Sequence, residues 1–224
     1  MNIPDYQEIK EIPLFSGISK EEYPVMLGCV GCEKVHYEKD AVIFLEEETI
    51  QHVGIVLFGA VYMIKEDIWG NKTILVHIRA GELFGETFIC SHAEQLKVTF
   101  ITAEQSEILF LPLYRILHTC SHSCIYHQKL TDNMITLIAD KNLQLIEKIE
   151  ITSKKTLREK ILCYLSIEAQ KAGSMYFEIP LGRVALAEYL CADRSALTRE
   201  LNRMKEEKII DFDKNTFRIL KRTV

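Results

Sequence analysis

The chain has 224 residues, of which 48% are hydrophobic and 26% charged, and it carries a formal net charge of −5. This composition is that of an ordinary globular protein with a sizeable core, so it excludes disordered and fibrous chains. A chain of this length fits either one domain or two.

The charge is unevenly distributed along the chain. Residues 1–150 contain 12 Lys and Arg against 22 Asp and Glu, a net charge of −10. Residues 151–224 contain 15 against 10, a net charge of +5. The whole-chain charge argues against a nucleic-acid partner, but the basic C-terminal part has the sign that such a partner requires.

Export and membrane signals are missing from the sequence as given. The opening MNIPDYQEIK has no apolar core after a basic start, so it does not read as a signal peptide. There is no run of about eighteen apolar residues that would span a membrane. The seven cysteines are an odd number, which favours reduced thiols over a disulfide framework. We therefore expect a cytoplasmic protein with no membrane contact.

The first half of the chain changes from helical to β-rich. Residues 1–32 look helical, with a turn at Leu14–Ser19. From Glu33 to about Leu111, short runs rich in β-branched residues follow one another between acidic or glycine-containing turns. Such runs favour strands, and the WGNK segment, residues 69–72, predicts a hairpin turn. Many short strands at this spacing predict a small antiparallel barrel or roll.

A long helix is predicted from Ile125 to about Glu150, because this stretch lacks Gly and Pro. Its apolar positions form broad stripes: Leu130, Met134 and Leu137 on one, continued with a shift by Ile138, Leu145 and Ile149. A helix with so much apolar surface must pack on the roll or on a twin helix from a second subunit. We expect both.

A hinge is predicted at Thr152–Ser153, just before a new helix. Thr156 and Glu159 have the spacing of a capping box, which marks the start of that helix. The helix should end near Gly173, and a short strand follows before the next helical segment.

Two helices separated by a tight turn are predicted between Arg183 and Ile210. Leu186 and Leu190 lie one turn apart on the first, and Asp193 stands where an N-cap should open the second. Leu197, Leu201 and Met204 would be buried. The opposite face would then carry Arg194, Ser195, Thr198, Arg199, Asn202 and Arg203. Three cations, three hydrogen-bonding groups and no acid suit a helix laid in the major groove of DNA. The alternative is an ordinary solvated face, although such a face normally includes Glu.

The helix pair is followed by IIDFDKNTFRIL, which has two β-like arms around Asp213–Asn215. A hairpin in this place would be the wing of a winged helix-turn-helix domain. Arg183, at the start of the first helix, is expected to touch phosphate.

This order of elements resembles the Crp/Fnr family of bacterial transcription regulators over essentially the whole chain. AGELFGE (80–86) resembles the family's glycine-rich effector-site turn, DRSALTREL (193–201) its recognition helix, and LFSGIS (14–19) its usual opening. The resemblance implies an α+β fold: an N-terminal double-stranded β-roll of the cyclic-nucleotide-binding type, a long dimerisation helix, and a C-terminal winged helix-turn-helix. The implied domains are a β-roll effector-sensing domain (1–125), the dimerisation helix (126–151) and the DNA-binding domain (152–224).

The family resemblance also implies partners. It predicts a homodimer on two-fold symmetric, double-stranded promoter DNA, with recognition helices about 34 Å apart, and contact with RNA polymerase. The predicted DNA-binding residues are Arg183, Arg194, Ser195, Thr198, Arg199 and Arg203, with Arg194 and Arg199 at the family's DNA-contacting positions. Ser195 stands where several members carry a base-reading Glu, so the preferred DNA sequence should differ from theirs.

The effector cannot be named from the sequence. Gly85, Glu86 and Lys97 are the candidate pocket residues. In members that bind cyclic AMP, an arginine and a small hydroxyl residue clamp the phosphate at the places held here by Leu96 and Lys97. A lone Lys is a point charge rather than a bidentate fork. The adenine-binding places of the long helix fall near Leu145 and Ile146, both apolar. We therefore expect the roll to bind a small molecule other than cyclic AMP, or none, and the cofactor is unknown.

Cysteine chemistry is the main alternative for sensing. Cys29 and Cys32 form a CxxC pair, and Cys120 and Cys124 lie in the HTCSHSC segment (118–124). Together they could serve thiol redox sensing, or hold a metal ion or iron–sulfur cluster. Oxygen-sensing members carry three clustered cysteines ahead of the roll, whereas this chain has two, so no metal ligand is assigned. Cys90-x-His92 is weak support for a haem.

An enzyme is not expected. His52, His77 and His92 lack the His-x-His spacing of metal-dependent β-barrel enzymes, and the sequence has no Ser-His-Asp or Walker-type arrangement. No catalytic residue is assigned. A cyclic-nucleotide-binding regulatory subunit without DNA contact is a third option, which the C-terminal helix pair disfavours.

Overall fold

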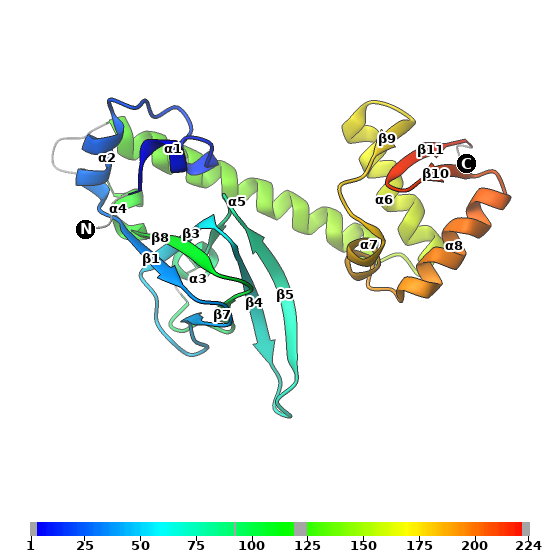
Figure 1. The fold of residues 1–224 in the computed structure, drawn as a ribbon, viewed down its shortest axis with the longest axis horizontal. Coiled ribbons are helices and arrows are strands. Elements are labelled where there is room, and N and C mark those ends of the chain that lie inside the picture. The colour runs from blue at the N-terminus through cyan, green and yellow to red at the C-terminus, as the bar shows by residue number, and fades with distance from the viewer. Residues whose placement is uncertain (1–3, 92, 119–124, 221–224) are drawn as a thin grey trace. The chain divides into compact units, whose positions relative to one another are not determined.

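A computed structural model describes residues 4–91, 93–118 and 125–220 of the chain (Figure 1). Its internal contacts divide the chain into two compact units, residues 1–138 and residues 139–224. Each unit has its own hydrophobic core and is described by itself. The part of the chain that the structure describes contains no helix with the length and apolarity needed to cross a membrane.

The first unit opens with short helices, as predicted. These are α1 (Tyr6–Ile9), the 3-10 helix η1 (Pro13–Phe15) and α2 (Tyr23–Val30). A capping box between Asp5 and Glu8 starts α1. Since both termini of such a short helix need external partners, this box satisfies N–H groups that would otherwise be exposed.

Eight strands follow, and they form the predicted roll. They are β1 (Glu33–Tyr37), β2 (Val42–Phe44), β3 (His52–Phe58), β4 (Ala60–Glu66), β5 (Lys72–Arg79), β6 (Leu83–Phe84), β7 (Thr99–Thr102) and β8 (Ser106–Pro112). One four-stranded sheet has the order β1-β8-β3-β6 and the other the order β2-β7-β4-β5. All pairings are antiparallel. This unit also contains helices α3 (Glu86–Cys90) and α4 (Leu113–Leu117).

The β4–β5 hairpin turns at the predicted WGNK segment. The Asp67 carboxylate accepts hydrogen bonds from the backbone N–H groups of Trp69 and Asn71, each at 2.9 Å. An Asp that bonds its own following backbone in this way stabilises a tight turn. The predicted hairpin is therefore confirmed.

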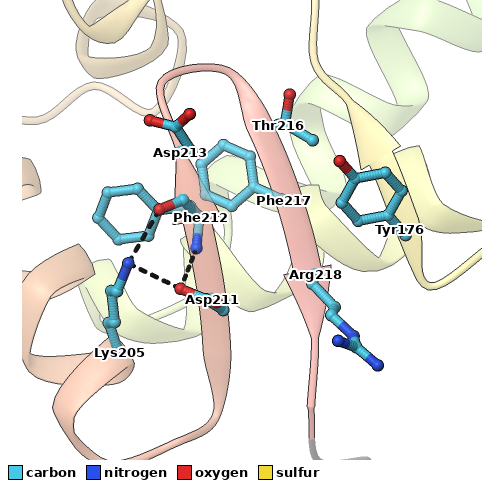
Figure 2. A pocket seen from close by; sticks show the side chains of 8 residues that line it. All are labelled: Tyr176, Lys205, Asp211, Phe212, Asp213, Thr216, Phe217 and Arg218. Carbon is cyan, nitrogen blue, oxygen red and sulfur yellow. Dashed lines mark hydrogen bonds and ion pairs between the residues drawn. The ribbon is translucent and has the colours of Figure 1, made fainter.

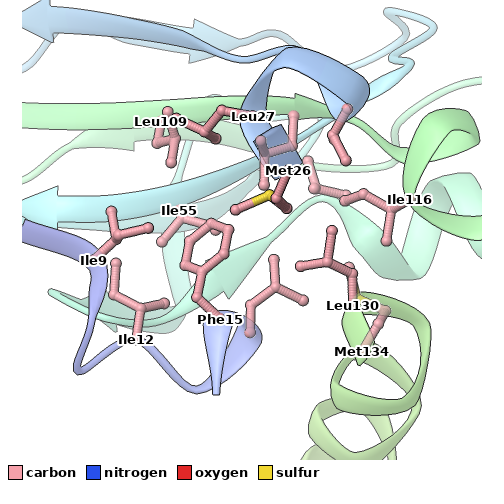
Figure 3. Packing of buried hydrophobic residues seen from close by; sticks show 14 of the residues in the cluster. Ile9, Ile12, Phe15, Met26, Leu27, Ile55, Leu109, Ile116, Leu130 and Met134 are labelled. Atoms are coloured by element: carbon pink, nitrogen blue, oxygen red, sulfur yellow. The ribbon is translucent and has the colours of Figure 1, made fainter. Parts of the chain in front are cut away.

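The long helix α5 (Ile125–Thr152) packs its first turns against the roll unit. Leu130 and Met134 are fully buried and join a core with Phe15, Met26 and Ile116 (Figure 3). Half of the expectation for this helix, packing on the roll, is thereby confirmed. Six of its later apolar residues are exposed, namely Ile135, Ile138, Leu143, Leu145, Ile146 and Ile149, whereas Ile151 is buried in the core of the second unit.

The division between the two units falls inside α5, at residue 138, rather than at its ends. The last turns of α5 are tied to the second unit: Glu147 forms an ion pair of 2.7 Å with Lys171, and Lys148 Nζ lies 3.9 Å from the centre of the Tyr189 ring. The predicted domain boundaries stay predictions. The contacts nevertheless show that the end of α5 packs against α6 and α7 of the second unit.

The second unit contains three helices after α5 and a small sheet. They are α6 (Leu157–Ala172), β9 (Tyr176–Glu178), α7 (Arg183–Tyr189), α8 (Arg194–Glu206), β10 (Ile210–Asp213) and β11 (Thr216–Ile219). Thr156 and Glu159 form the predicted capping box, and α6 ends at Gly173 in a left-handed conformation. The wing is a three-stranded antiparallel sheet of order β10-β11-β9.

Candidate nucleic-acid interface and effector domain

The start of α8 is fixed by its N-cap residue. Asp193 Oδ1 accepts from the backbone N–H of Ser195 at 2.9 Å and of Ala196 at 3.0 Å. The Ser195 hydroxyl also donates to this oxygen, at 2.5 Å. These donors, the Ser195 hydroxyl first, lower the pKa of Asp193, because they favour the charged carboxylate. The predicted N-cap is confirmed.

The turn between α7 and α8 is tight, and Cys191 occupies it with a φ of 51°. Glycine is the residue that adopts this left-handed conformation without steric cost. The backbone of the turn is held by the N–H of Ala192, which donates to the carbonyl of Ala187 at 2.9 Å. Cys191 therefore adopts a backbone conformation that is strained for a residue with a side chain.

The two faces of α8 separate as the sequence predicts. Leu197, Leu201 and Met204 are buried against the second unit's core. The outward face consists of exposed residues only: Arg194, Ser195, Thr198, Arg199, Asn202 and Arg203. We call this set the α8 face. Its helical backbone presents three arginines and short hydroxyls on one rigid surface.

Two contacts orient side chains within the α8 face. The Thr198 hydroxyl donates to the carbonyl of Arg194 at 2.9 Å, which leaves the lone pairs of its oxygen as acceptors. Arg199 Nε donates weakly to the carbonyl of Ser195 at 3.4 Å. A guanidinium held by only one such contact keeps its remaining N–H donors for an external acceptor.

The far end of α8 carries a charge network that sequence reasoning missed. Arg158, on α6, grips Glu207 with two hydrogen bonds of 2.7 and 2.9 Å and donates to Glu200 at 2.5 Å. Glu207 also accepts from Arg203 Nε at 3.1 Å. The α8 face thus has an acidic residue, Glu207, at its edge, and this carboxylate already forms an ion pair with Arg203. The signal was the Arg203–Glu207 spacing of four residues, which places both on one helical ridge.

This network predicts an acid-dependent contribution to stability. Arg158 lowers the pKa of Glu207 below its usual 4.5, so the contribution is present above pH 4.5 and is lost as the pH falls through the lower, folded-state pKa. We expect Glu207→Gln to lower the melting temperature at pH 7, with the difference from wild type shrinking as the pH falls below 4.5. Glu206→Gln, the same change at an exposed neighbour, is the control. A pH-independent difference for Glu207→Gln would contradict the assignment.

The side chain of Arg183 lies against the wing, whereas a phosphate contact was expected of it. Its Nη2 donates to the backbone carbonyl of Lys214 in the wing turn at 2.6 Å. Its guanidinium carbon lies 5.0 Å from the Phe212 ring centre and 5.1 Å from that of Phe217. Burial lowers its pKa. The predicted phosphate contact stays a prediction, but the structure directs this side chain toward the wing.

The outer side of the wing lines an open pocket of about 580 Å³ (Figure 2). Lys205 and Arg218 supply positive charge there, and Asp211 and Asp213 supply negative charge. Lys205 is bound to Asp211 at 2.7 Å. A pocket with balanced charges lacks the excess of cations that a phosphate backbone requires.

The effector-pocket candidates have different environments in the roll. Gly85 has a φ of 87° and precedes α3, a conformation that favours glycine. Glu86 is buried, whereas Lys97 is exposed. Their grouping as one pocket stays a prediction.

The space between the two sheets is filled by aromatic and aliphatic side chains. Phe44 lies 5.6 Å from Phe110 and 6.2 Å from Phe100, and Phe84 lies 5.1 Å from Phe100, measured between ring centres. Leu96 is 1% exposed within this cluster. A phosphate at this position would lose its hydration without gaining a charged partner from Leu96, which is costly.

The thiol of Cys32 lies in a setting that disfavours its reactive form. Cys29 and Cys32 are half-buried, and burial raises the pKa of the Cys32 thiol. A raised pKa disfavours the thiolate, the form that reacts with oxidants and binds metals. Cys120 and Cys124 lie outside the described residues. Among the residues that are described, no cluster of His, Cys, Asp and Glu could hold a metal ion.

Similar proteins are known for both units. The family model of the cyclic nucleotide-binding domain matches residues 34–123, and that of the Crp-like helix-turn-helix domain matches residues 159–223. The cyclic AMP receptor protein of Thermus thermophilus is 22% identical over 218 residues, which are 94% of each chain.

Solved structures show the same fold. CooA of Carboxydothermus hydrogenoformans, in a mutant form, matches with a TM-score of 0.58 and 17% identity over 91% of this chain and 88% of its own. The cyclic di-GMP-responsive regulator CLP of Xanthomonas campestris matches with a TM-score of 0.56 and 14% identity over 89% and 98%. The predicted family and fold class are confirmed: the chain, with its effector-binding-type domain ahead of a Crp-like helix-turn-helix domain, belongs to the Crp/Fnr family of transcription regulators.

Proposed function

We propose that this regulator works as a homodimer that reads a specific DNA sequence through the α8 face. The observation that carries the proposal is that α8 buries Leu197, Leu201 and Met204 while its exposed side carries Arg194, Arg199 and Arg203. A helix of this kind on a helix-turn-helix scaffold fits the major groove. The basic charge of residues 151–224 supports the same partner, because phosphates attract Lys and Arg at any sequence.

Arg194 and Arg199 are the proposed base or phosphate contacts, since a guanidinium can bind guanine O6 and N7 with both arms. Ser195 and Thr198 stand beside them with hydroxyls short enough for a phosphate or a base edge. Arg203 is proposed to bind phosphate, with weaker effect because Glu207 shares it.

The exposed part of α5 supports dimerisation with a second copy of the chain. Ile135, Ile138, Asn142, Leu145 and Ile149 follow one another at spacings of three and four residues, which is the pattern of a coiled-coil seam. Leu145 is 60% exposed and Ile149 64%. A matching helix would cover both, and Asn142 at a seam position would favour one register.

The effector is proposed to be a molecule other than cyclic AMP. The buried Leu96 and the phenylalanine cluster around it support this, because neither offers a charged group to a phosphate. As a prediction, millimolar cyclic AMP should leave both the melting temperature and the DNA affinity of the purified protein unchanged, since a ligand stabilises only the state it binds. Native mass spectrometry of the same sample would reveal any other small molecule retained from the cells. A cyclic-AMP-induced increase in either property would overturn the proposal.

Effector control is proposed to act through the segment around Thr152–Ser153. Its structural support is the set of contacts that tie the end of α5 to α6 and α7, including the Glu147–Lys171 pair. A change in these contacts would alter the spacing of two recognition helices in a dimer. Contact with RNA polymerase remains an expectation from the family resemblance.

The direct test is selection of bound sequences from a random double-stranded DNA library by the full-length protein. We expect a two-fold symmetric sequence whose half-sites lie about one helical turn, 34 Å, apart. Fluorescence anisotropy at fixed salt then compares this sequence with a scrambled one. Equal affinity for both, or no binding at low ionic strength, would refute sequence-specific regulation by this chain.

A further inference from the structure

Arg183 connects the first helix of the helix-turn-helix to the wing, and it does so by three separate contacts. Its Nη2 donates to the carbonyl of Lys214 at 2.6 Å. Its guanidinium also lies over two aromatic rings of the wing sheet, those of Phe212 and Phe217, at 5.0 and 5.1 Å. Both distances are within the range of a cation–π interaction.

Two of the three guanidinium nitrogens of Arg183 are directed at the protein rather than at an external acceptor. Its Nη1 is buried and has no hydrogen-bond partner, so this nitrogen is shielded from any acceptor in solution. The Nη2 donor is directed at the wing's own backbone. A buried donor without a partner is costly, and the adjacent ring faces offset part of that cost through their negative electrostatic potential.

The backbone that Arg183 holds is the strained part of the wing. Lys214 has a φ of 48°, an uncommon conformation for a residue with a side chain. Beside it, the carbonyl of Asn215 accepts from the N–H of Ile179 at 2.9 Å. The turn is therefore fastened at two consecutive carbonyls, one of them by a charged donor.

A second cation contacts the same aromatic ring from α8. Lys205 Nζ donates to the carbonyl of Phe212 at 3.0 Å and lies 5.0 Å from its ring centre (Figure 2). Phe212 thus receives one cation from the start of α7 and another from the last turn of α8. Both helices of the DNA-reading motif are joined to the wing through this residue.

We propose that Arg183 is a positioning residue that fixes the wing turn relative to the recognition helix, rather than a phosphate contact. This inference rests on the proposed function for its effect on DNA binding, but its structural part concerns the free protein alone. The lysine variant separates the two roles: Arg183→Lys keeps the positive charge that a phosphate needs but loses the planar group and the fork that hold the wing.

The experiment is hydrogen exchange on the free, full-length protein. In Arg183→Lys we expect amides of β10 and β11 to exchange about tenfold faster, since a charge-assisted hydrogen bond is lost, while amides of α6 stay unchanged. Arg218→Lys, the same substitution on the exposed side of the wing, should exchange like wild type. Unchanged wing exchange in Arg183→Lys would overturn the proposal, and it would do so whether or not the protein binds DNA.

A second variant protects the test against a folding defect. Phe212→Leu removes the ring but keeps Arg183, and it should also speed exchange in the wing. In the double variant, Arg183→Lys with Phe212→Leu, the factor by which wing amides exchange faster should be smaller than the product of the factors for the two single variants, because both changes remove the same contact. An exchange-rate factor equal to that product would show that Arg183 and Phe212 act independently and would contradict the proposal.

DNA affinity supplies the remaining readout. We expect Arg183→Lys to bind the selected DNA more weakly than wild type with the same dependence on salt. A phosphate contact would instead leave Arg183→Lys near wild-type affinity. It would also lower the salt slope of Arg183→Ala by about 0.9 for each arginine lost. A wild-type protein that ignores DNA would end the proposed function, but the exchange result for Arg183 would stand.

Discussion

Replacing Arg199 by Ala should weaken binding to the selected DNA by at least about 30-fold. Loss of one base-reading arginine costs about 1–3 kcal/mol, and a homodimer loses two of them on a symmetric site. The total is then about 2–6 kcal/mol, if the two half-sites contribute independently. Arg199 is exposed on the α8 face and makes one weak contact to its own helix at 3.4 Å. The substitution should therefore leave the fold intact.

The measurement is fluorescence anisotropy at a fixed salt concentration, repeated over a salt series. If Arg199 reads a base, specificity for the selected sequence falls at one position of each half-site and the salt slope changes little. If it binds only phosphate, affinity falls for all sequences and the slope falls by about 0.9 per arginine. Arg79→Ala is the control, since it removes an exposed arginine from the roll. Wild-type affinity and specificity in Arg199→Ala would remove the α8 face from the interface.

Those parts of the fold that depend on local pattern were accessible from the sequence. Asp193 and Thr156 cap their helices because a short oxygen-bearing side chain at that place satisfies free N–H groups, whatever lies further away. Leu197, Leu201 and Met204 are buried because their spacing puts them on one side of a helix. The β4–β5 turn likewise depends on Asp67 and its immediate neighbours.

Features that depend on distant partners were not accessible. The sequence places Arg183 at the start of a helix, where a phosphate contact is the natural expectation, but its position is decided by Phe212, Phe217 and the Lys214 carbonyl. These are about thirty residues away. The Arg158–Glu207 pair has the same character, since it joins α6 to α8 across the fold. Long side chains with several donors select such partners only after the helices have packed.

In the effector region the sequence predicted the apolar residue at position 96 but not the packing around it. Comparison of motifs found that Leu96 stands where cyclic-AMP-binding members carry arginine, and the buried, apolar setting of Leu96 agrees with a different ligand chemistry. The shape of a pocket, however, depends on how several rings pack together. The contacts among Phe44, Phe84 and Phe100 could not be deduced from the spacing of those residues in the sequence.

Replacing Leu145 by Glu should convert the proposed dimer into a monomer and abolish tight binding to the two-half-site DNA. Leu145 lies in the exposed seam of α5, between Ile138 and Ile149. In a parallel pair of helices the two glutamates would face each other across the seam, where desolvation and like-charge repulsion oppose association. A monomer would then contact only one half-site, so the binding free energy of the second would be lost.

Analytical ultracentrifugation measures the oligomeric state, and anisotropy with one-half-site and two-half-site DNA measures the coupling between subunits. We expect Leu145→Glu to sediment as a monomer with the weak affinity of a single half-site on both DNAs. Gln144→Glu introduces the same charge at the adjacent exposed position, outside the seam of three- and four-residue spacings, and should remain dimeric. A dimer in Leu145→Glu with wild-type DNA affinity would show that α5 does not form the subunit interface. Because the fold of each unit does not depend on Leu145, which is already 60% exposed, a loss of dimer at unchanged melting temperature would assign the effect to association rather than to unfolding.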